Sequence, residues 1–293
     1  MISSLFGILT LLRPRPIVLN HLQPTTASTS PGTTSDDPVH IVNELRMSML
    51  QLKGKFMDDK GERVNYASMR DSLEFRRYQE LARKLPSIQL DDLSLSARKA
   101  LFINTYNCLI LHGLVANQLT SYDTISRLTF YATTSYSIGG HILSLNDIEN
   151  GLLRGNRRSP VPLSSLPFKS NDPRLKYALP CDPRIHFALN CAAKSCPPIA
   201  VYSSNDSELE DQLNLATGAF LENSLEIDTP NKCVTLSMLF KWYAKDFGDN
   251  DHQRLEWIAS HCIPEQASKL RAFLNSCPNF NIRYSPYSWD LNE

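Results

Sequence analysis

Apolar residues recur at helical spacing in the first part of the chain. Between residues 39 and 56 they fall on one face of a helix, at Ile41, Val42, Leu45, Met49 and Leu52. A polar turn at 58–63 follows. The next stretch, 66–86, predicts a second helix that ends at Pro86, because proline disfavours helical backbone in the residue before it.

The segment 95–119 is the most apolar stretch and is hydrophobic nearly all round, which predicts a buried helix with Ser96 as a cap. Four polar residues interrupt its apolar surface: Asn104, Tyr106, Asn107 and His112. A buried polar group without a hydrogen bond costs about 1–3 kcal/mol. This helix is therefore expected to line a polar network or a site.

The middle and end of the chain combine short alternating runs with further helices. Two alternating runs flank Gly139-Gly140, which predicts a hairpin, and Ser144 with Asp147 resembles a capping box at the start of a short helix. Beyond a loop at 157–174, the pattern predicts a short strand and a helix within 232–248, two amphipathic helices and a terminal strand within 280–292.

These elements predict an α+β fold, a helix-rich single domain with a small, mostly antiparallel sheet. We divide the chain into a disordered or targeting-like leader at 1–37, a helical N-terminal extension at 38–93 that packs on the core, and a domain at 94–293.

The leader has no acidic residue before Asp36 and is rich in Ser, Thr and Pro, which is typical of disordered and organelle-transit segments. Its apolar run at 1–12 is too short to cross a bilayer, so we predict no transmembrane segment. We expect a cytoplasmic protein, with organelle targeting by the leader as the alternative.

Net charge bears on the kind of partner, and cysteine content bears on the redox compartment. Basic and acidic residues are equal in number, with 30 of each, so no basic field predicts a nucleic acid partner. The seven cysteines are odd in number and scattered, which favours free thiols in a reducing compartment. The expected partner is an unknown protein or small molecule.

The block 186–198, HFALNCAAKSCPP, holds a histidine and two cysteines. Read as an α-helix begun by Asp182, it places Cys191 about 140° round from His186; read as a strand, it places them on opposite faces. We favour a strand followed by a loop. In both readings His186 is a poor local base for Cys191, and His112 or His141 would have to be supplied by the fold.

The two thiols allow four interpretations. Cys191 or Cys196 could be a nucleophile, with Lys194 lowering the pKa of the thiol. With His186 and a remote ligand such as His112 they could bind zinc, although this spacing is no known ligand pattern. A disulfide is sterically conceivable but is not expected to persist in a reducing compartment. Small buried hydrophobic residues are the commonest role of free cysteines.

Standard catalytic motifs are absent from the chain. It has no phosphate-binding loop, no G-x-G-x-x-G, no G-x-S-x-G, no H-E-x-x-H and no C-x-x-C. We predict no cofactor and no metal, and the motifs leave open whether the protein is an enzyme.

Five blocks of the sequence in order resemble a known family. LFINTYNCLILH, YSIGGHILSLNDIENGLLRGN, DPRIHFALNCAAKSCPPI, VTLSMLFKWYAKDFG and IRYSPYSWDLN together resemble the domain of unknown function 547 family, over about 94–292. The positions that match its pattern are Asn104, Tyr106, Asn107, His112, Gly139, Asp147, Glu149, Arg154, Asp182, Arg184, His186, Phe187, Cys191, Cys196, Pro197, Trp242, Asp246 and Phe247. The resemblance implies membership and no reaction. Relatives in plants carry the domain behind a coiled coil, and relatives in animals carry it beside glutaredoxin-like and DEP-like modules.

Two hypotheses follow. The first is a protein-interaction or signalling module with a buried His/Asn/Cys polar network, and we favour it. The alternative is a cysteine-dependent hydrolase or acyl transferase. The candidate catalytic residues of that alternative are Cys191, Cys196, His186, His112, Asn104 and Asn107.

Overall fold

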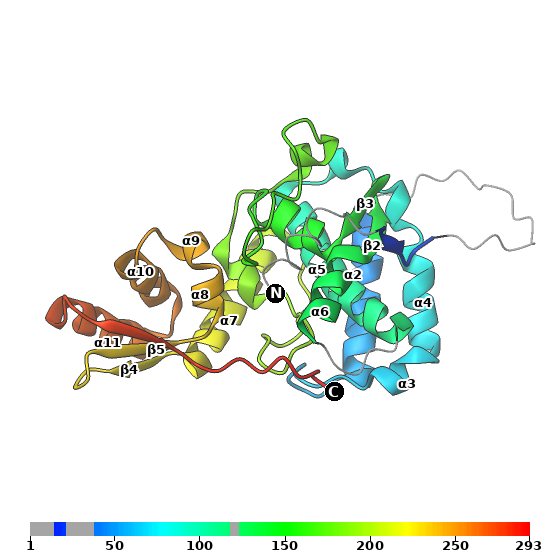
Figure 1. Ribbon diagram of the computed structural model, residues 1–293. Coiled ribbons are helices and arrows are strands. Elements are labelled where there is room, and N and C mark those ends of the chain that lie inside the picture. The colour runs from blue at the N-terminus through cyan, green and yellow to red at the C-terminus, as the bar shows by residue number, and fades with distance from the viewer. Residues whose placement is uncertain (1–14, 22–37, 118–122) are drawn as a thin grey trace, which may run out of the picture.

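Two groups of helices and strands, each around its own hydrophobic cluster, make up the computed structural model (Figure 1). The structure describes residues 15–21, 38–117 and 123–293. The first cluster draws on residues 41–213 together with Leu291, and the second on Phe187 and residues 221–277. In the described residues, no helix has the length and hydropathy needed to cross a membrane.

The first group is mostly helical. Its helices are α2 (Pro38–Phe56), α3 (Tyr66–Arg70), α4 (Leu73–Ala82), α5 (Leu95–Asn117) and α6 (Thr124–Thr133), with short 3-10 turns at Leu85–Ser87 and Leu90–Asp92. The apolar face predicted for α2 is buried, as its hydrophobic spacing requires. α5 is buried along most of its length and forms the centre of this group.

The cap of α5 differs from the prediction. The Ser94 hydroxyl, rather than that of Ser96, accepts a hydrogen bond from the Ala97 N–H at 3.1 Å. Ser96 lies one residue inside the helix and donates its hydroxyl to Asp206 instead. The predicted cap was therefore two residues late.

A three-stranded sheet lies beside α5. Its strands are β1 (Ile17–Val18), β2 (Thr134–Ile138) and β3 (His141–Ser144). β2 and β3 form the predicted hairpin, and Gly139 and Gly140 have φ of +55° and +76°, which a two-residue turn of this type requires. Ser144 and Asp147 exchange backbone-to-side-chain hydrogen bonds, as a capping box does, at the start of the π-helix η3 (Asp147–Leu153).

One piece of the predicted leader is part of the fold. β1 pairs in parallel with β2, and the buried Asn20 side chain donates to the carbonyls of Ala82 and Ser137 at 2.9 Å each. Hydrophobic periodicity did not indicate this strand, because it has two residues only. The remainder of the leader lies outside the described residues.

The second group begins with α7, whose Leu209 and Leu213 still belong to the first hydrophobic cluster, and contains a second sheet (Figure 1). Its helices are α7 (Asp206–Ser224), α8 (Leu239–Trp242), α9 (Ala244–Phe247), α10 (Asp251–His261) and α11 (Pro264–Ser276), and its strands are β4 (Glu226–Asp228), β5 (Cys233–Leu236) and β6 (Asn281–Tyr284). β4 is antiparallel to β5, whereas β6 is parallel to it.

The helix-rich α+β class is confirmed. The sheet differs from the prediction in number and direction, since there are two small mixed sheets. In each sheet, two strands close in sequence are antiparallel, and a strand from near one end of the described chain adds the parallel pairing. These added strands are β1 in the first sheet and β6 in the second. Such long-range pairing leaves no local signal in the sequence.

The block 183–187 is neither the favoured strand nor an α-helix. It forms the 3-10 helix η5 (Pro183–Phe187). The Asp182 carboxylate explains this, because it accepts the Arg184 N–H at 3.1 Å and both ends of the Arg184 guanidinium at 2.7–2.9 Å. This local clamp begins a tight turn, which Pro183 permits at the first helical position.

Candidate functional site

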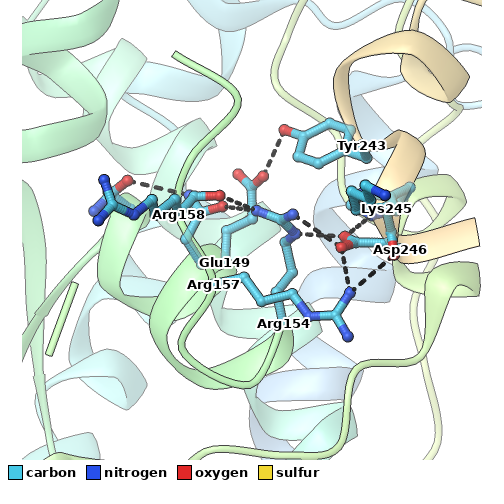
Figure 2. Close-up of polar contacts among 10 residues, drawn as sticks. Glu149, Arg154, Arg157, Arg158, Tyr243, Lys245 and Asp246 are labelled. Carbon is cyan, nitrogen blue, oxygen red and sulfur yellow. Dashed lines mark hydrogen bonds and ion pairs between the residues drawn. The ribbon is translucent and has the colours of Figure 1, made fainter. Parts of the chain in front are cut away.

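Asp246 of α9 is the centre of a buried charged cluster (Figure 2). Its carboxylate accepts the Nε2 proton of His186 at 2.8 Å. It accepts two hydrogen bonds from Arg154, at 2.6 and 3.0 Å, and one from Arg157 at 2.6 Å. The side chain of Asp246 is 0 % exposed and that of His186 is 2 % exposed.

Aromatic rings extend this cluster. The Tyr243 ring stacks on the His186 ring with 4.0 Å between centroids, and the Arg154 guanidinium lies 4.7 Å from the Tyr243 centroid. The Tyr243 hydroxyl donates to Glu149 at 2.6 Å, and the Tyr106 hydroxyl donates to the other oxygen of Glu149 at 3.2 Å. The cluster thus meets the hydrogen-bonding needs of its own side chains, which are two carboxylates, two arginines, one histidine and two tyrosines.

The charge state of the cluster follows from burial. Burial opposes the charge on Asp246, but hydrogen bonds from His186 and Arg154 outweigh it and hold the pKa of Asp246 well below its usual range. Burial lowers the pKa of His186, and Asp246 offsets this only in part. At neutral pH the ring is therefore neutral and donates its single N–H to Asp246, while Arg154 and Arg157 balance the carboxylate charge.

The cluster lies where the two hydrophobic clusters meet. Within η5, Ile185 belongs to the first hydrophobic cluster and Phe187 to the second, with His186 between them. Arg154 follows η3 in the first group, and Asp246 belongs to α9 in the second. The charged contacts therefore join the two groups of elements.

The two cysteines of the sequence block form a disulfide between Cys191 and Cys196. The expectation of free thiols is wrong for this pair, and the other five cysteines are free. The Cys191 N–H donates to the Cys196 sulfur at 3.1 Å. The hydroxyl of Tyr287 lies 3.1 Å from the Cys196 sulfur and 3.5 Å from the Cys191 sulfur.

Asparagine side chains hold the backbone around this loop. Asn107 of α5 donates to the Ala188 carbonyl and accepts the Asn190 N–H, both at 2.9 Å. Asn190 in turn donates to the Pro197 carbonyl at 2.7 Å and accepts the Ala192 N–H at 2.8 Å. Asn104 makes the same paired contact with the backbone of Tyr202, at 2.8 and 2.9 Å.

These contacts give Asn104 and Asn107 a structural position. Each amide uses both its oxygen and its nitrogen on one backbone segment. Neither amide is aimed at the sulfur of Cys191 or Cys196. They anchor two loops to α5 and satisfy buried polar groups that would otherwise be costly.

His112 lies in a separate place, with aromatic neighbours from α4 and β2. Its Nδ1 contacts the Tyr136 hydroxyl at 2.8 Å and its Nε2 contacts the Gln79 side chain at 3.2 Å. The Phe75 ring packs edge-on against it, with 5.3 Å between centroids. Burial, with a smaller contribution from Arg83, lowers the pKa of His112 to about 4.

The candidate residues therefore divide into three places. Within the described residues, neither His112 nor His186 is hydrogen-bonded to the sulfur of Cys191 or Cys196. The zinc set of Cys191, Cys196, His186 and His112 is not brought together, because its members are bound to other partners. The described parts of the chain hold no group of three or more His, Cys, Asp or Glu side chains placed to bind a metal ion.

Sequence reasoning missed the partners of these residues. Asp246 and Arg154 appeared only as positions matching the family pattern, and Tyr243 and Tyr287 were not singled out. One signal was available for Asp246, since a lone acidic residue between the aromatic residues Tyr243 and Phe247 requires a buried partner.

Comparison with known proteins gives one match. A family model described as "Protein of unknown function, DUF547" matches residues 90–221. No curated protein and no solved structure matches the chain.

Proposed function

Because residues 90–221 belong to the DUF547 family, whose description assigns no reaction, we propose a function from the site itself. The chain acts as a protein-interaction module of the kind used in signalling, and its buried His/Asn/Asp/Arg network is the frame of that module. We place it in the cytoplasm, with residues 94–293 as the module and 38–93 as a helical extension of its core.

One observation carries the proposal: His186 is buried against Asp246. A general base needs a lone pair directed at the group it deprotonates. The neutral ring donates its N–H to Asp246 and keeps a lone pair on Nδ1, but the side chain is 2 % exposed, so water and substrate do not reach it. Leaving a buried polar group without its partner costs about 1–3 kcal/mol, and more for a charged group, so this contact stabilises the joint between the two groups of elements.

The hydrolase alternative has less support. Its nucleophile would be Cys191 or Cys196, and both sulfurs are consumed by the disulfide. Its proposed oxyanion donors, Asn104 and Asn107, donate their amide N–H groups to the backbone carbonyls of Tyr202 and Ala188.

Substitution of His186 tests the structural role. We expect His186→Ala to lower the free energy of unfolding by about 3 kcal/mol, since the buried carboxylate of Asp246 loses a hydrogen-bond donor. His186→Gln keeps an N–H donor and is expected to recover part of that loss. The measurement is urea unfolding at neutral pH, with His252→Ala as the control, because His252 is exposed on α10.

A chemical role for His186 predicts a different result. His186→Ala would then keep the wild-type free energy of unfolding and lose the biological activity of the full chain. That combination contradicts the proposal, whereas a loss of stability that His186→Gln partly restores supports it.

A further inference from the structure

We propose that the Cys191–Cys196 disulfide is a thiol–disulfide exchange site, at which a protein dithiol attacks the sulfur of Cys191 and Cys196 leaves as the thiolate. This inference does not rest on the interaction-module function. It assigns a chemical activity to the disulfide loop, whose cysteines are not part of the charged cluster around Asp246.

The two sulfurs differ in their hydrogen-bond donors. The Cys196 sulfur receives the Cys191 N–H at 3.1 Å and lies 3.1 Å from the Tyr287 hydroxyl. Among the described residues, the Cys191 sulfur has one possible donor, the Tyr287 hydroxyl at 3.5 Å. Hydrogen bonds to an anionic acceptor are stronger than those to a neutral one. The negative charge that develops on opening the disulfide is therefore better stabilised on Cys196.

Tyr287 is suited to this role because it stays protonated. Burial raises the pKa of its hydroxyl above the ordinary tyrosine value. A protonated hydroxyl beside the sulfur donates to a thiolate and repels no incoming anion. A thiol whose thiolate is stabilised is the better leaving group in exchange.

The loop keeps its shape independently of the disulfide. Ala192 lies between the two cysteines with φ of +65°, a conformation that residues other than glycine rarely adopt. The Asn190 side chain accepts the Ala192 N–H at 2.8 Å, and the Ala192 carbonyl accepts the Asn292 N–H at 3.0 Å. The sulfurs therefore stay near each other after reduction, and the disulfide can form again.

The surroundings of the pair favour a polypeptide as the exchange partner. Both cysteines are partly exposed. Tyr287 packs against two other partly exposed aromatic residues, Trp242 and Trp289, with centroid distances of 4.8 and 4.6 Å. Aromatic side chains are enriched where proteins bind proteins. The expected partner is thus a dithiol protein with apolar residues beside its cysteines.

The remaining cysteines provide a contrast within the same chain. Cys108, Cys233 and Cys277 are buried, and burial raises the pKa of the Cys108 thiol to about 12. Burial also raises the pKa of the partly exposed Cys181, to about 11. The thiols of Cys108 and Cys181 are therefore mostly protonated at neutral pH and react slowly.

The exchange balances without a further reactant. A thiolate of the partner forms a bond to the Cys191 sulfur as the Cys191–Cys196 bond breaks and the electron pair goes to Cys196. The second thiol of the partner, as its thiolate, then attacks the mixed disulfide and expels Cys191. The partner becomes a disulfide, and Cys191 and Cys196 become two thiols after Cys191 takes up one proton and Cys196 another.

The test follows exchange in the full chain with dithiothreitol as the dithiol probe and alkylation read by mass spectrometry. Protein purified without reductant should show Cys191 and Cys196 linked, and dithiothreitol should open this bond first and reversibly. Tyr287→Phe keeps the ring, and we expect it to slow reduction about five- to tenfold, because the leaving thiolate loses a donor. Tyr202→Phe is the control, since that buried hydroxyl has no hydrogen-bond partner among the described residues.

Single cysteine variants test which sulfur leaves. In Cys191→Ser the remaining Cys196 thiol should label at lower pH than the Cys191 thiol does in Cys196→Ser, by about one pH unit. The opposite order overturns the assignment of the leaving group. Recovery of both cysteines as free thiols that oxidised dithiothreitol does not join overturns the proposal as a whole.

Discussion

The charge of a single imidazole is set by its neighbours at the residue scale. The His112 ring lies among Phe75, Tyr78 and Tyr136, and the nearest charge that affects it is the cation of Arg83. None of these groups stabilises a second positive charge. The ring is therefore neutral in the folded protein at pH values where the unfolded chain already binds a proton.

This difference makes stability depend on pH. The pKa of His112 is about 4 when folded and about 6.5 when unfolded, so its contribution is complete above pH 6.5 and is lost as pH falls towards 4. The full difference corresponds to about 3 kcal/mol. We expect the free energy of unfolding, measured in urea between pH 7 and pH 4, to fall less steeply for His112→Gln than for the wild type.

His252→Gln is the matched control for that series, because it removes an exposed histidine. Its curve should run parallel to that of the wild type. A His112→Gln curve that is also parallel would show that His112 does not carry the pH dependence.

Elements that form from neighbouring residues were predictable, and those that depend on distant partners were not. The hairpin at Gly139-Gly140 and the capping box of Ser144 and Asp147 are signalled within a few residues. The sequence predicts a loop around Cys191 and Cys196, as the structure shows. It does not indicate which distant side chains hold this loop in place. Its amide partner Asn107 lies 81 and 83 residues away, and its hydroxyl partner Tyr287 lies more than 90 residues away. Side-chain identity marks such residues as polar in an apolar helix, without indicating which backbone they reach.

Asn107 gives a prediction for α5 and the loop that it holds. We expect Asn107→Ala to lower the free energy of unfolding by about 2–4 kcal/mol, because the Ala188 carbonyl and the Asn190 N–H are both left buried without a partner. Thermal and urea unfolding measure this loss. Hydrogen exchange at Asn190 should accelerate as well.

Asn223→Ala is the corresponding control on α7. That side chain is exposed and bonds only to the carbonyl one turn earlier, so the change in stability should stay within about 0.5 kcal/mol. Equal effects of the two substitutions would contradict the role given to Asn107.

The charged cluster at Asp246 and the C-terminal tail are among the contacts that join the halves of the molecule. The tail runs back from β6 to the first group (Figure 1). The tail forms a bridge between Leu291 and Ala193, and the Asn292 carbonyl accepts the Val64 N–H at 2.7 Å. The tail therefore covers the disulfide loop and ties it to the first group.

Removal of the tail should lower the stability of the protein and expose the disulfide loop. A chain ending at residue 287 keeps Tyr287 and is expected to lose about 3–5 kcal/mol of stability, since several backbone hydrogen bonds contribute about 1 kcal/mol each. Because the hydroxyl donor is kept while the Ala193–Leu291 bridge is lost, Cys191 and Cys196 should also be reduced faster. Urea unfolding and timed alkylation measure the two effects.

A chain ending at residue 292 is the control, because Glu293 is exposed. It should behave as the wild type does. A chain ending at 287 with unchanged stability and unchanged reduction would show that residues 288–293 do not hold the loop.

The position of the tail has a consequence for the order of events during biosynthesis. A ribosome makes Tyr287 96 residues after Cys191. At about 5–20 residues per second, the loop waits on the order of 5–20 seconds before its cover is made. In that interval the nascent chain presents both cysteines without the Tyr287 hydroxyl and without the Ala193–Leu291 bridge. Oxidising enzymes and chaperones thus meet a more open loop on the growing chain than on the finished protein.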